Sequence, residues 1–456
     1  MLFLYSLLLT LGIVALLPRF IYDALRHGKY IPGLRQRLGQ LPLIETGGRP
    51  VIWLHCVSVG ETQAARPLVR AIRERFPTHA LVVSTTTMTG QRVALEAFRE
   101  EAAAVLYFPF DWGWSTRRAL RAVNPSAVLI METELWPRFL FECRARRVPV
   151  ALLNGRLSEK SFRNYRLILP FIRRVVNCLD LALMQTETDA ARLSALGLAP
   201  ERLTVTGNVK FDADSASGEQ ALTEELRERF SLSKHRPLIV AASTHAPEER
   251  VILSAFKQLR AAHAVNQPRL LLAPRHPERF AEVASLIEAS GLSWSRRSAQ
   301  PGPKDVACDV ILLDSIGELR AVYTLAAVVF VGGSIARTGG HNVLEPAATG
   351  SCILTGHHTF NFASIIRAFR EANALVQLPP LSEEEAPHTL TSLLKELLAD
   401  EQRRHELGAR ALELFAQNRG ATERTLNLLT PLLAAAARKS ERLDQPGAKR
   451  EGAFNA

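Results

Sequence analysis

Residues 51–76 read VIWLHCVSVGETQAARPLVRAIRERF, in which a β-rich apolar run passes through a short loop into an amphipathic helix. Similar runs recur, separated by helical stretches, at 80–87, 103–110, 127–134, 150–156, 181–186 and 203–208. Short apolar runs that alternate with helices are typical of a parallel sheet with crossover helices. The first half of the chain is therefore predicted to be a doubly wound α/β domain.

A second series of β-rich runs starts near Pro237, at 237–244, 269–274, 309–315, 328–334 and 351–356. The intervening stretch, 211–233, has no strand pattern and is interpreted as a linker and a first helix. We expect two Rossmann-like α/β domains, 22–210 and 211–437, and the last helices of the second can pack back on the first. Ligands of such proteins bind at the carboxyl ends of the strands, which predicts a central cleft faced by both sheets.

The composition excludes two broad classes of protein. The 456 residues are 47% hydrophobic and 22% charged, which excludes a largely disordered chain. A mean hydropathy of +0.03 excludes a polytopic membrane protein. The net charge of +11 indicates an anionic partner, which can be nucleic acid, a membrane surface or an acidic substrate. The five scattered cysteines lack a metal-binding spacing and are expected to be free thiols in a reducing compartment.

The amino terminus carries an uncharged apolar run, LFLYSLLLTLGIVALL at 2–17, which approaches the length of a membrane span when it is extended to residue 21. Positive residues follow the run at Arg19, Arg26, Lys29, Arg35 and Arg37. The positive-inside bias places that side in the cytoplasm. We predict that 1–21 is a single-pass anchor helix, with a buried hydrophobic helix and a signal peptide as the alternatives. A signal peptide is disfavoured because no basic residue precedes the run and no small-residue cleavage site follows it.

The carboxyl terminus has a different character. Residues 438–456 are polar and lack a hydrophobic period, which predicts a disordered tail.

Acidic and basic side chains follow the strands predicted in the first half. Glu61 comes after the first strand, where it is either a general base for a sugar hydroxyl or a complement to the helix dipole. Ser58 lies beside it, and Gly60 is expected to permit a tight turn. The fourth strand ends in Glu132 and Glu134, which are either helix-terminal acids or contacts to a hydroxyl-rich ligand.

Arg156 follows the fifth predicted strand. A guanidinium at a strand end suits an anionic ligand group, and a structural salt bridge is the alternative.

The second half has its own set of candidate residues at strand ends. Ser243 and Thr244 are expected to cap a helix whose positive end is available to phosphate, or simply to cap it. Arg275 and His276 sit in a proline-flanked turn that suits a phosphate or carboxylate, with a surface ion pair as the alternative.

The densest of these stretches is rich in glycine. Its paired glycines allow backbone amides to approach an anion. Glu345 follows in the sequence and can hold ribose hydroxyls. We predict a binding function for Gly333, Ser334, Gly340, His341, Asn342 and Glu345.

The sequence offers no good metal site. The histidines are far apart and no HExxH is present. The one DxD, Asp212 to Asp214, lies in the expected linker and is interpreted as a pair of solvated loop acids.

Five sequence blocks in order resemble the Kdo (3-deoxy-D-manno-octulosonic acid) transferases of lipopolysaccharide assembly. They are His55 with 58–61, 131–137, 207–212 without Val209, 274–279 and 339–347 without Val343. Any single block is moderately specific, whereas five in order are a strong signal. The resemblance covers nearly all of the chain before the tail.

The resemblance implies a GT-B glycosyltransferase of the family 30 type, with two doubly wound domains and no metal or cofactor. It implies CMP-Kdo as donor and the tetraacylated disaccharide precursor of lipid A (lipid IVA) as acceptor, at the inner membrane of Gram-negative bacteria. Glu61 resembles the catalytic base of an inverting transfer. The acceptor-side or supporting residues would be Ser58, Gly60, Glu132, Glu134 and Arg156. The donor-side residues would be Ser243, Thr244, Arg275, His276, Gly333, Ser334, Gly340, His341, Asn342 and Glu345.

Other functions remain open at this point. A UDP-sugar transferase or epimerase has the same architecture, and fold alone does not choose between them. A non-catalytic, membrane-anchored carrier of acidic lipid would bind the acceptor and release no CMP. Nucleic-acid binding is disfavoured because basic and aromatic residues are not interleaved. We interpret the basic charge as attraction to acidic lipid and acceptor, which predicts a steep loss of binding as salt rises.

Overall fold

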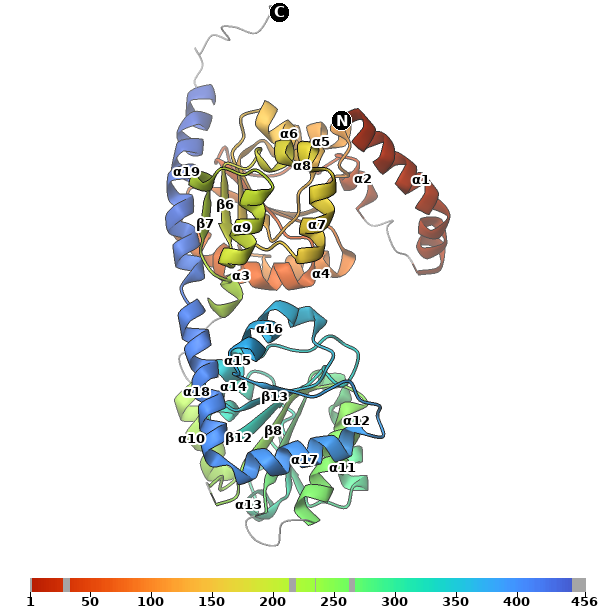
Figure 1. Ribbon diagram of the computed structural model, residues 1–456, viewed down its shortest axis with the longest axis vertical. Coiled ribbons are helices and arrows are strands. Elements are labelled where there is room, and N and C mark those ends of the chain that lie inside the picture. Colours follow the sequence, from red (N-terminus) through yellow and green to blue (C-terminus); the bar gives the residue numbers. More distant parts are fainter. Residues whose placement is uncertain (1, 28–32, 213–218, 234, 262–266, 445–456) are drawn as a thin grey trace, which may run out of the picture. The chain divides into compact units, whose positions relative to one another are not determined.

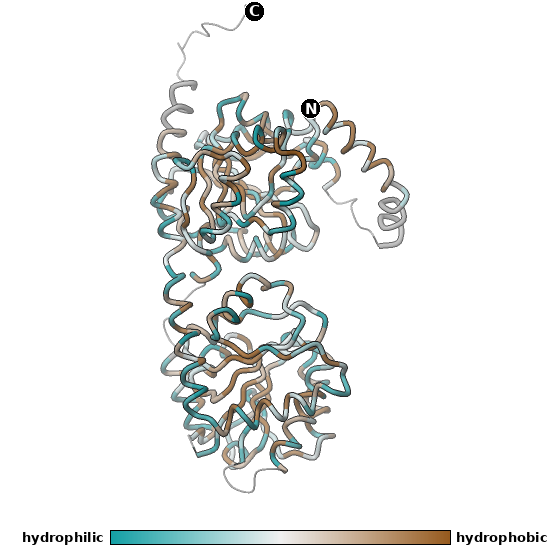
Figure 2. The backbone as a smooth tube through the Cα atoms, viewed as in Figure 1, coloured by the Kyte–Doolittle hydropathy of each residue, from teal (hydrophilic) through white to brown (hydrophobic). Residues whose placement is uncertain are grey.

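The computed structural model describes residues 2–27, 33–212, 219–233, 235–261 and 267–444. The chain divides into two compact units. The first unit runs to Asp214 and takes in the segment from Arg419 onward, and the second unit is Ser215–Asn418. Each unit is a sheet with helices on both faces, and the apolar residues gather in the strands (Figures 1 and 2).

The sheet of the first unit is wholly parallel, with strand order β3-β2-β1-β4-β5-β6-β7. Its strands are β1 Val51–His55, β2 Ala80–Thr85, β3 Ala104–Tyr107, β4 Pro125–Met131, β5 Val150–Gly155, β6 Leu181–Met184 and β7 Leu203–Val205. All seven were predicted. The order changes direction between β1 and β4, so the loops after these two strands meet at the switch point where ligands of such sheets bind.

Helices cover both faces of this sheet because successive strand residues point to opposite sides. The helices are α3 Val59–Arg75, α4 Met88–Ala97, α5 Gly113–Val123, α6 Pro137–Ala145, α7 Glu159–Leu167, α8 Leu169–Val176, α9 Glu187–Ala195 and α19 Ala421–Asp444. Val51 and Trp53 of β1 pack in a cluster with α5, α6, α8 and α9. Ile52 and Leu54 pack in the opposite cluster with α3, α4 and α19.

The final helix is fastened to the first unit by polar contacts at its amino end. Asp212 accepts hydrogen bonds from the backbone N–H of Gly420 at 2.6 Å and of Thr422 at 2.5 Å. Arg75 of α3 forms an ion pair with Glu423 at 2.7 Å. Asp212 is therefore a helix cap and not a solvated loop acid, while Asp214 lies outside the described residues. The prediction of a tail from residue 438 is wrong as far as Asp444, which ends α19, and 445–456 lie outside the described residues.

The sheet of the second unit is also parallel, with strand order β10-β11-β9-β8-β12-β13-β14. Its strands are β8 Leu238–Thr244, β9 Arg269–Pro274, β10 Trp294–Arg296, β11 Val310–Leu312, β12 Ala326–Val331, β13 Ile353–Thr355 and β14 Val376–Gln377. The short edge strands β10 and β14 were not predicted. The switch point lies between β8 and β12, and β9 flanks β8 on the other side.

Helices again lie on both faces. They are α10 Glu219–Arg229, α11 Glu248–Ala261, α12 Phe280–Ala289, α13 Pro303–Ala307, α14 Leu319–Tyr323, α15 Leu344–Ala348, α16 Ala363–Glu371, α17 Ala386–Ala399 and α18 Glu401–Asn418. One face of the sheet packs against α11, α12 and α17 in a single apolar cluster. On the other face, α14 contacts both α10 and the strands β8 and β12.

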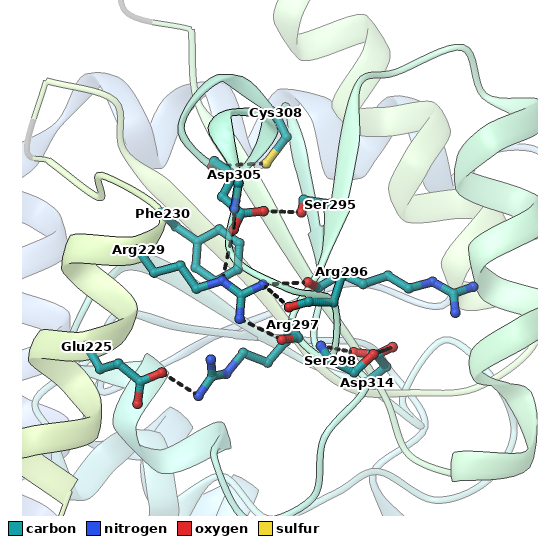
Figure 3. A network of polar contacts seen from close by, with 12 residues as sticks. Glu225, Arg229, Phe230, Ser295, Arg296, Arg297, Ser298, Asp305, Cys308 and Asp314 are labelled. Atoms are coloured by element: carbon teal, nitrogen blue, oxygen red, sulfur yellow. Dashed lines mark hydrogen bonds and ion pairs between the residues drawn. The ribbon is translucent and has the colours of Figure 1, made fainter.

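A buried network fastens α10 to the edge of this sheet (Figure 3). Arg229 Nε donates to Asp305 Oδ2 at 2.9 Å, and the two side chains are only 7% and 3% exposed. The terminal nitrogens of Arg229 donate to the carbonyl oxygens of Arg296, Arg297 and Ala299. Since both charges are paired and further hydrogen-bonded, the desolvation cost of burying them is offset.

The amino-terminal segment forms one long helix, α1 Leu2–His27, that docks on the first unit. Tyr5 Oη donates to Asp111 Oδ2 at 2.8 Å, and Arg138 Nε donates to Ser6 Oγ at 2.9 Å. In the described residues, no helix is both long enough and apolar enough to cross a membrane. The prediction of a membrane-spanning anchor over 1–21 is therefore not supported.

Arg37, one of the basic residues expected beside the anchor, is buried in the first unit. Arg37 ends the short helix α2 Leu34–Arg37, is 9% exposed, and lies over the ring of Tyr107 at 4.5 Å. Its charge is therefore buried in the first unit and does not contribute to a basic surface.

Candidate functional site

The first half-site lies where β1 and β4 end. Glu61 is in the first turn of α3 and is 8% exposed. Its Oε2 accepts the backbone N–H of Val57 at 2.7 Å, and Oε1 accepts the Ser58 hydroxyl at 3.3 Å. The loop after β1 therefore holds the carboxylate in one orientation.

The pKa of Glu61 is raised to about 8, chiefly by burial and in addition by the negative charges of Glu132 and Glu134, while the Val57 N–H and the Ser58 hydroxyl oppose the shift. A carboxyl group with this pKa is a stronger base, once ionised, than an exposed glutamate. Strongly perturbed pKa values at a switch point are a mark of functional sites.

The loop after β4 supplies the other two carboxylates. Glu132 adopts a left-handed backbone conformation with φ of 55°, which is uncommon for a residue other than glycine. Its Oε1 forms an ion pair with Lys210 Nζ at 2.9 Å. Burial and the charge of Glu132 raise the pKa of Glu134. The structure thus brings Glu132 and Glu134 close enough to Glu61 to act on it electrostatically.

Gly60 does not form the turn that was predicted for it. It lies in the first turn of α3, its φ is not positive, and a Cβ there would meet only the Ser58 hydroxyl, at 4.0 Å. Arg156 follows β5 directly and is partly buried at the same edge of the sheet.

His55 belongs to the core rather than to the site. It is fully buried, stacks on Phe108 with ring centroids 3.8 Å apart, and its Nδ1 lies 3.0 Å from Ser84 Oγ. Burial lowers the pKa of His55 to about 3, which keeps the ring neutral.

The second half-site lies where β8, β9 and β12 end. Ser243 and Thr244 are the last residues of β8, and α11 begins only at Glu248. The prediction that they cap this helix is therefore wrong. Ser243 has a φ of 54°, a left-handed conformation at the strand end that parallels Glu132 in the first unit.

The glycine-rich loop after β12 binds a carboxylate of the chain itself. Glu248 is completely buried, and its Oε1 accepts the backbone N–H groups of Ser334 and Ile335 at 2.8 Å. Its Oε2 accepts those of Gly333 at 2.7 Å and His245 at 2.9 Å. The predicted anion contact of Gly333 and Ser334 is thus made with Glu248. The Ser334 hydroxyl is also engaged, since it donates to the Val331 carbonyl and accepts from Gly356 N–H.

Three histidines and an arginine gather beside this loop. The Nε2 atoms of His245 and His341 are 2.8 Å apart, and His276 meets the His245 ring edge to face at 5.0 Å. Arg275 follows β9, is exposed, and acts electrostatically on both His245 and His341. The sequence had placed His276, His341 and Arg275 in one donor site, and the structure brings them together.

The remaining donor-side candidates lie along the same loop. Gly340 has a φ of 77° and donates its N–H to the Gly333 carbonyl at 2.7 Å. Asn342 Nδ2 donates to Glu345 Oε1 at 3.3 Å, in the first turn of α15. Both Asn342 and Glu345 are partly exposed, so they are accessible to a ligand.

Sequence reasoning missed three residues of these half-sites. They are Lys210, which lies in one of the sequence blocks, and His245 and Glu248, which follow β8. The signal for Glu248 was present, because an acid three residues after a strand-end histidine can reach back to the loop amides. Within the described ranges, no three histidine, cysteine or acidic side chains are grouped so as to hold a metal ion.

Comparison with known proteins gives relatives over most of the chain. A family model described as 3-deoxy-D-manno-octulosonic-acid transferase (kdotransferase) matches residues 32–213. The 3-deoxy-D-manno-octulosonic acid transferase of Bordetella pertussis is 38% identical over 384 residues, covering 83% of this chain and 86% of that protein. The transferase of the same name from Haemophilus influenzae is 35% identical over 382 residues, covering 84% and 87%.

A solved structure extends the comparison to the fold. MurG of Acinetobacter baumannii has a TM-score of 0.52 at 10% identity, and the match covers 84% of this chain and 99% of that one. This likeness shows the fold alone, which is that of the GT-B glycosyltransferases, as expected from the sequence.

Proposed function

The chain belongs to the 3-deoxy-D-manno-octulosonic acid (Kdo) transferase family, and we propose that it moves Kdo from CMP-Kdo to the tetraacylated disaccharide precursor of lipid A. The transfer inverts the anomeric centre and uses Glu61 as general base, without a metal ion. The first unit holds the acceptor and the second holds the donor. The observation that carries the proposal is the buried Glu61 at the switch point, in a chain whose relatives carry this name.

The geometry around Glu61 supports its role as the base. The Val57 N–H and the Ser58 hydroxyl hold the carboxylate in place, and the raised pKa makes it a good proton acceptor once it is ionised. In the proposed step, Glu61 takes the proton of an acceptor hydroxyl as that oxygen attacks the anomeric carbon of Kdo. A positioned base of this kind contributes about 10²- to 10⁴-fold to the rate.

The carboxylates after β4 have a supporting role in this proposal. Glu132 and Glu134 are close enough to Glu61 to raise its pKa, and Lys210 compensates the charge of Glu132. Partly exposed carboxylates can also accept hydrogen bonds from sugar hydroxyls, which suits a disaccharide acceptor. Asn342 and Glu345 offer the same kind of contact to the nucleotide in the second unit.

We further propose that the enzyme works on the cytoplasmic side of the inner membrane. Phe3 is 78% exposed and Leu8 60%, whereas Tyr5 and Ser6 of the same helix contact the first unit. A helix docked through polar residues with its apolar side chains uncovered can lie in the boundary between lipid headgroups and acyl chains. Attraction to acidic lipid by the net charge of +11 would add to this binding.

The membrane proposal is tested by sedimentation with vesicles of acidic phospholipid. Leu8→Asp is expected to weaken vesicle binding. Leu412→Asp, the same substitution at an exposed leucine on α18, is the control and should leave vesicle binding unchanged. Binding should also fall steeply between low and high salt, because surface charges are screened. Equal binding by both variants at all salt concentrations would contradict the proposal.

The activity is tested with the purified chain, CMP-Kdo and the lipid A precursor. We expect CMP release together with a product whose mass has increased by Kdo, and a loss of about 10²- to 10⁴-fold in Glu61→Gln. Glu96→Gln, which changes an exposed glutamate on α4, is the matched control and should keep full activity. Near-normal turnover of folded Glu61→Gln would rule out the base, and acceptor binding without CMP release would indicate a carrier.

A further inference from the structure

Four amides at the start of the glycine-rich loop are not available to a donor phosphate. The backbone N–H groups of Gly333, Ser334, Ile335 and Ala336 all donate to the Glu248 carboxylate. A Cβ at Gly332 would come within 2.8 Å of Glu248 Oε2, so the loop and the carboxylate are in close contact. The phosphate of a nucleotide sugar therefore needs hydrogen-bond donors other than these four amides.

A pair of imidazoles lies beside the occupied loop. The rings of His245 and His341 are nearly parallel, at 8°, and their Nε2 atoms are 2.8 Å apart. A contact of that length between two ring nitrogens requires one hydrogen between them, donated by one ring and accepted by the other. If both Nε2 atoms carried hydrogens, the two N–H groups would repel each other. Only one of the two Nε2 atoms therefore carries a hydrogen.

The surroundings of the pair are cationic rather than acidic. His276 and Arg275 on the loop after β9 act electrostatically on both rings, and Arg279 on the same segment acts on His245. Arg279 is occupied by Glu249 and Glu282, at 2.7 and 2.9 Å. The Arg275 side chain has no carboxylate partner anywhere in the described part of the chain, so its charge is free to meet an anion.

Two acids also lie near the pair, on α11, and neither is free. Glu248 is held by the loop amides, and Glu249 is paired with Arg279. Burial lowers the pKa of His245, and the charge of His276 lowers it further. Burial also lowers the pKa of His341 to about 4, with His245, Arg275 and His276 adding to the effect. Without an anion, both rings are therefore neutral at physiological pH.

We propose that the His245–His341 pair, together with Arg275, binds the phosphate of the donor and takes up a proton when the phosphate arrives. This inference rests on the proposed function. The phosphate oxygen replaces one ring nitrogen as hydrogen-bond acceptor, so both rings can then carry Nε2 hydrogens. A neighbouring negative charge favours the protonated imidazole.

The captured proton has a chemical use in the transfer. The phosphodiester of CMP-Kdo carries one negative charge. When the bond between the phosphate oxygen and the anomeric carbon breaks, the electron pair stays on that oxygen, and the phosphate gains a second charge. An imidazolium already in contact stabilises this charge as it develops. The proton returns to solvent, or leaves with CMP, when the nucleotide dissociates.

The experiment measures CMP binding by the full-length chain with isothermal titration calorimetry. Titrations at pH 7 in buffers of different ionisation enthalpy give the number of protons taken up per CMP. At that pH the free phosphate is largely doubly ionised, because its second pKa is about 6. We expect an uptake approaching about one proton. Cytidine, which lacks the phosphate, is expected to bind more weakly and without uptake.

Two variants test the pair itself. His245→Gln and His341→Gln each keep a hydrogen-bonding group near Nε2 and cannot titrate. Each is expected to abolish the uptake and to weaken CMP binding by about 10- to 100-fold, the range for a lost charge-assisted hydrogen bond. His388→Gln, on the exposed side of α17, is the control and should behave as wild type.

Several results would overturn the inference. Uptake that persists in both variants, or tight CMP binding without uptake in the wild type, would show that the pair does not carry the proton. Equal proton uptake with cytidine would show that the uptake does not depend on the phosphate. A wild-type chain that binds neither CMP nor cytidine would refute the donor in the proposed function itself. The two substitutions lie on different loops, and thermal unfolding shows whether either variant has a folding defect. If one variant is misfolded, proton uptake by the other, folded variant still tests the inference.

Discussion

Replacing Glu61 by glutamine is expected to remove catalysis and to stabilise the first unit in a pH-dependent way. The fold raises the pKa of this carboxyl from its ordinary value of 4.5 to about 8, because it is buried near two other carboxylates. Between these two pH values the folded chain binds more protons than the unfolded chain. Stability must therefore fall as the pH rises through this window.

The size of the effect follows from the same two values. The difference between 4.5 and about 8 corresponds to at most about 5 kcal/mol, which is fully lost only above pH 8. At pH 5 the loss is below about 1 kcal/mol, so the wild type should lose up to about 4 kcal/mol between pH 5 and pH 8.5. Glutamine cannot ionise, and the variant should therefore lack this decline. Any change in the hydrogen bonds to Val57 and Ser58 adds a difference in the free energy of unfolding between the two proteins that is the same at every pH.

The assay is unfolding by denaturant, followed by tryptophan fluorescence at several pH values. Four of the five tryptophans, Trp53, Trp112, Trp114 and Trp136, lie in the first unit, and Trp294→Phe in every protein restricts the signal to that unit. Glu96→Gln is again the control and should follow the wild type. A stability difference between Glu61→Gln and wild type that is flat from pH 5 to 8.5 would refute the raised pKa. The same pKa predicts that kcat/KM of the wild type rises from pH 7 to 9.

Three further predictions concern other parts of the structure. Glu132→Gln removes a charge that raises the pKa of Glu61, so the rise of kcat/KM should move to lower pH; an unmoved profile would argue against the coupling. Arg229→Ala leaves Asp305 buried without its partner and should cost the second unit about 3–5 kcal/mol in denaturant unfolding, unlike Arg227→Ala, whose ion pair is exposed. Asp212→Ala removes the cap of α19 and should cost about 1–2 kcal/mol, seen as faster hydrogen exchange in its first turn; unchanged exchange there would contradict it.

The local sequence pattern was sufficient to predict most strands of the two sheets. Runs such as 51–54 and 238–242 are apolar on every residue because parallel strands are covered on both faces, and this pattern can be read without tertiary contacts. The two strands that were missed, β10 and β14, read WSR and VQ, so neither carries the apolar run that marks the other strands. Strand ends then gave the positions of Glu61, Glu132, Arg275 and His341, since ligands of such sheets bind there.

The amino-terminal helix shows what a local sequence pattern leaves out. An uncharged apolar run from Leu2 to Leu17 predicts a membrane span. The sequence does not say that Tyr5 meets Asp111, or that Ser6 meets Arg138, more than 100 residues away. These contacts use the few polar side chains of the run to dock it on the first unit.

The sequence by itself determined two parallel α/β units, the strand ends that carry the candidate residues, and the family. These features depend on residue type and local spacing. Only the tertiary structure decided that Glu248 fills the glycine-rich loop, that Lys210 pairs with Glu132, and that His245 and His341 share a hydrogen. Each of these joins residues separated by 78 to 96 positions, and their partners are fixed by the order of strands and the loop geometry at the switch point. A charge or a ring nitrogen acquires its role from what surrounds it in space, and that information is absent from local spacing.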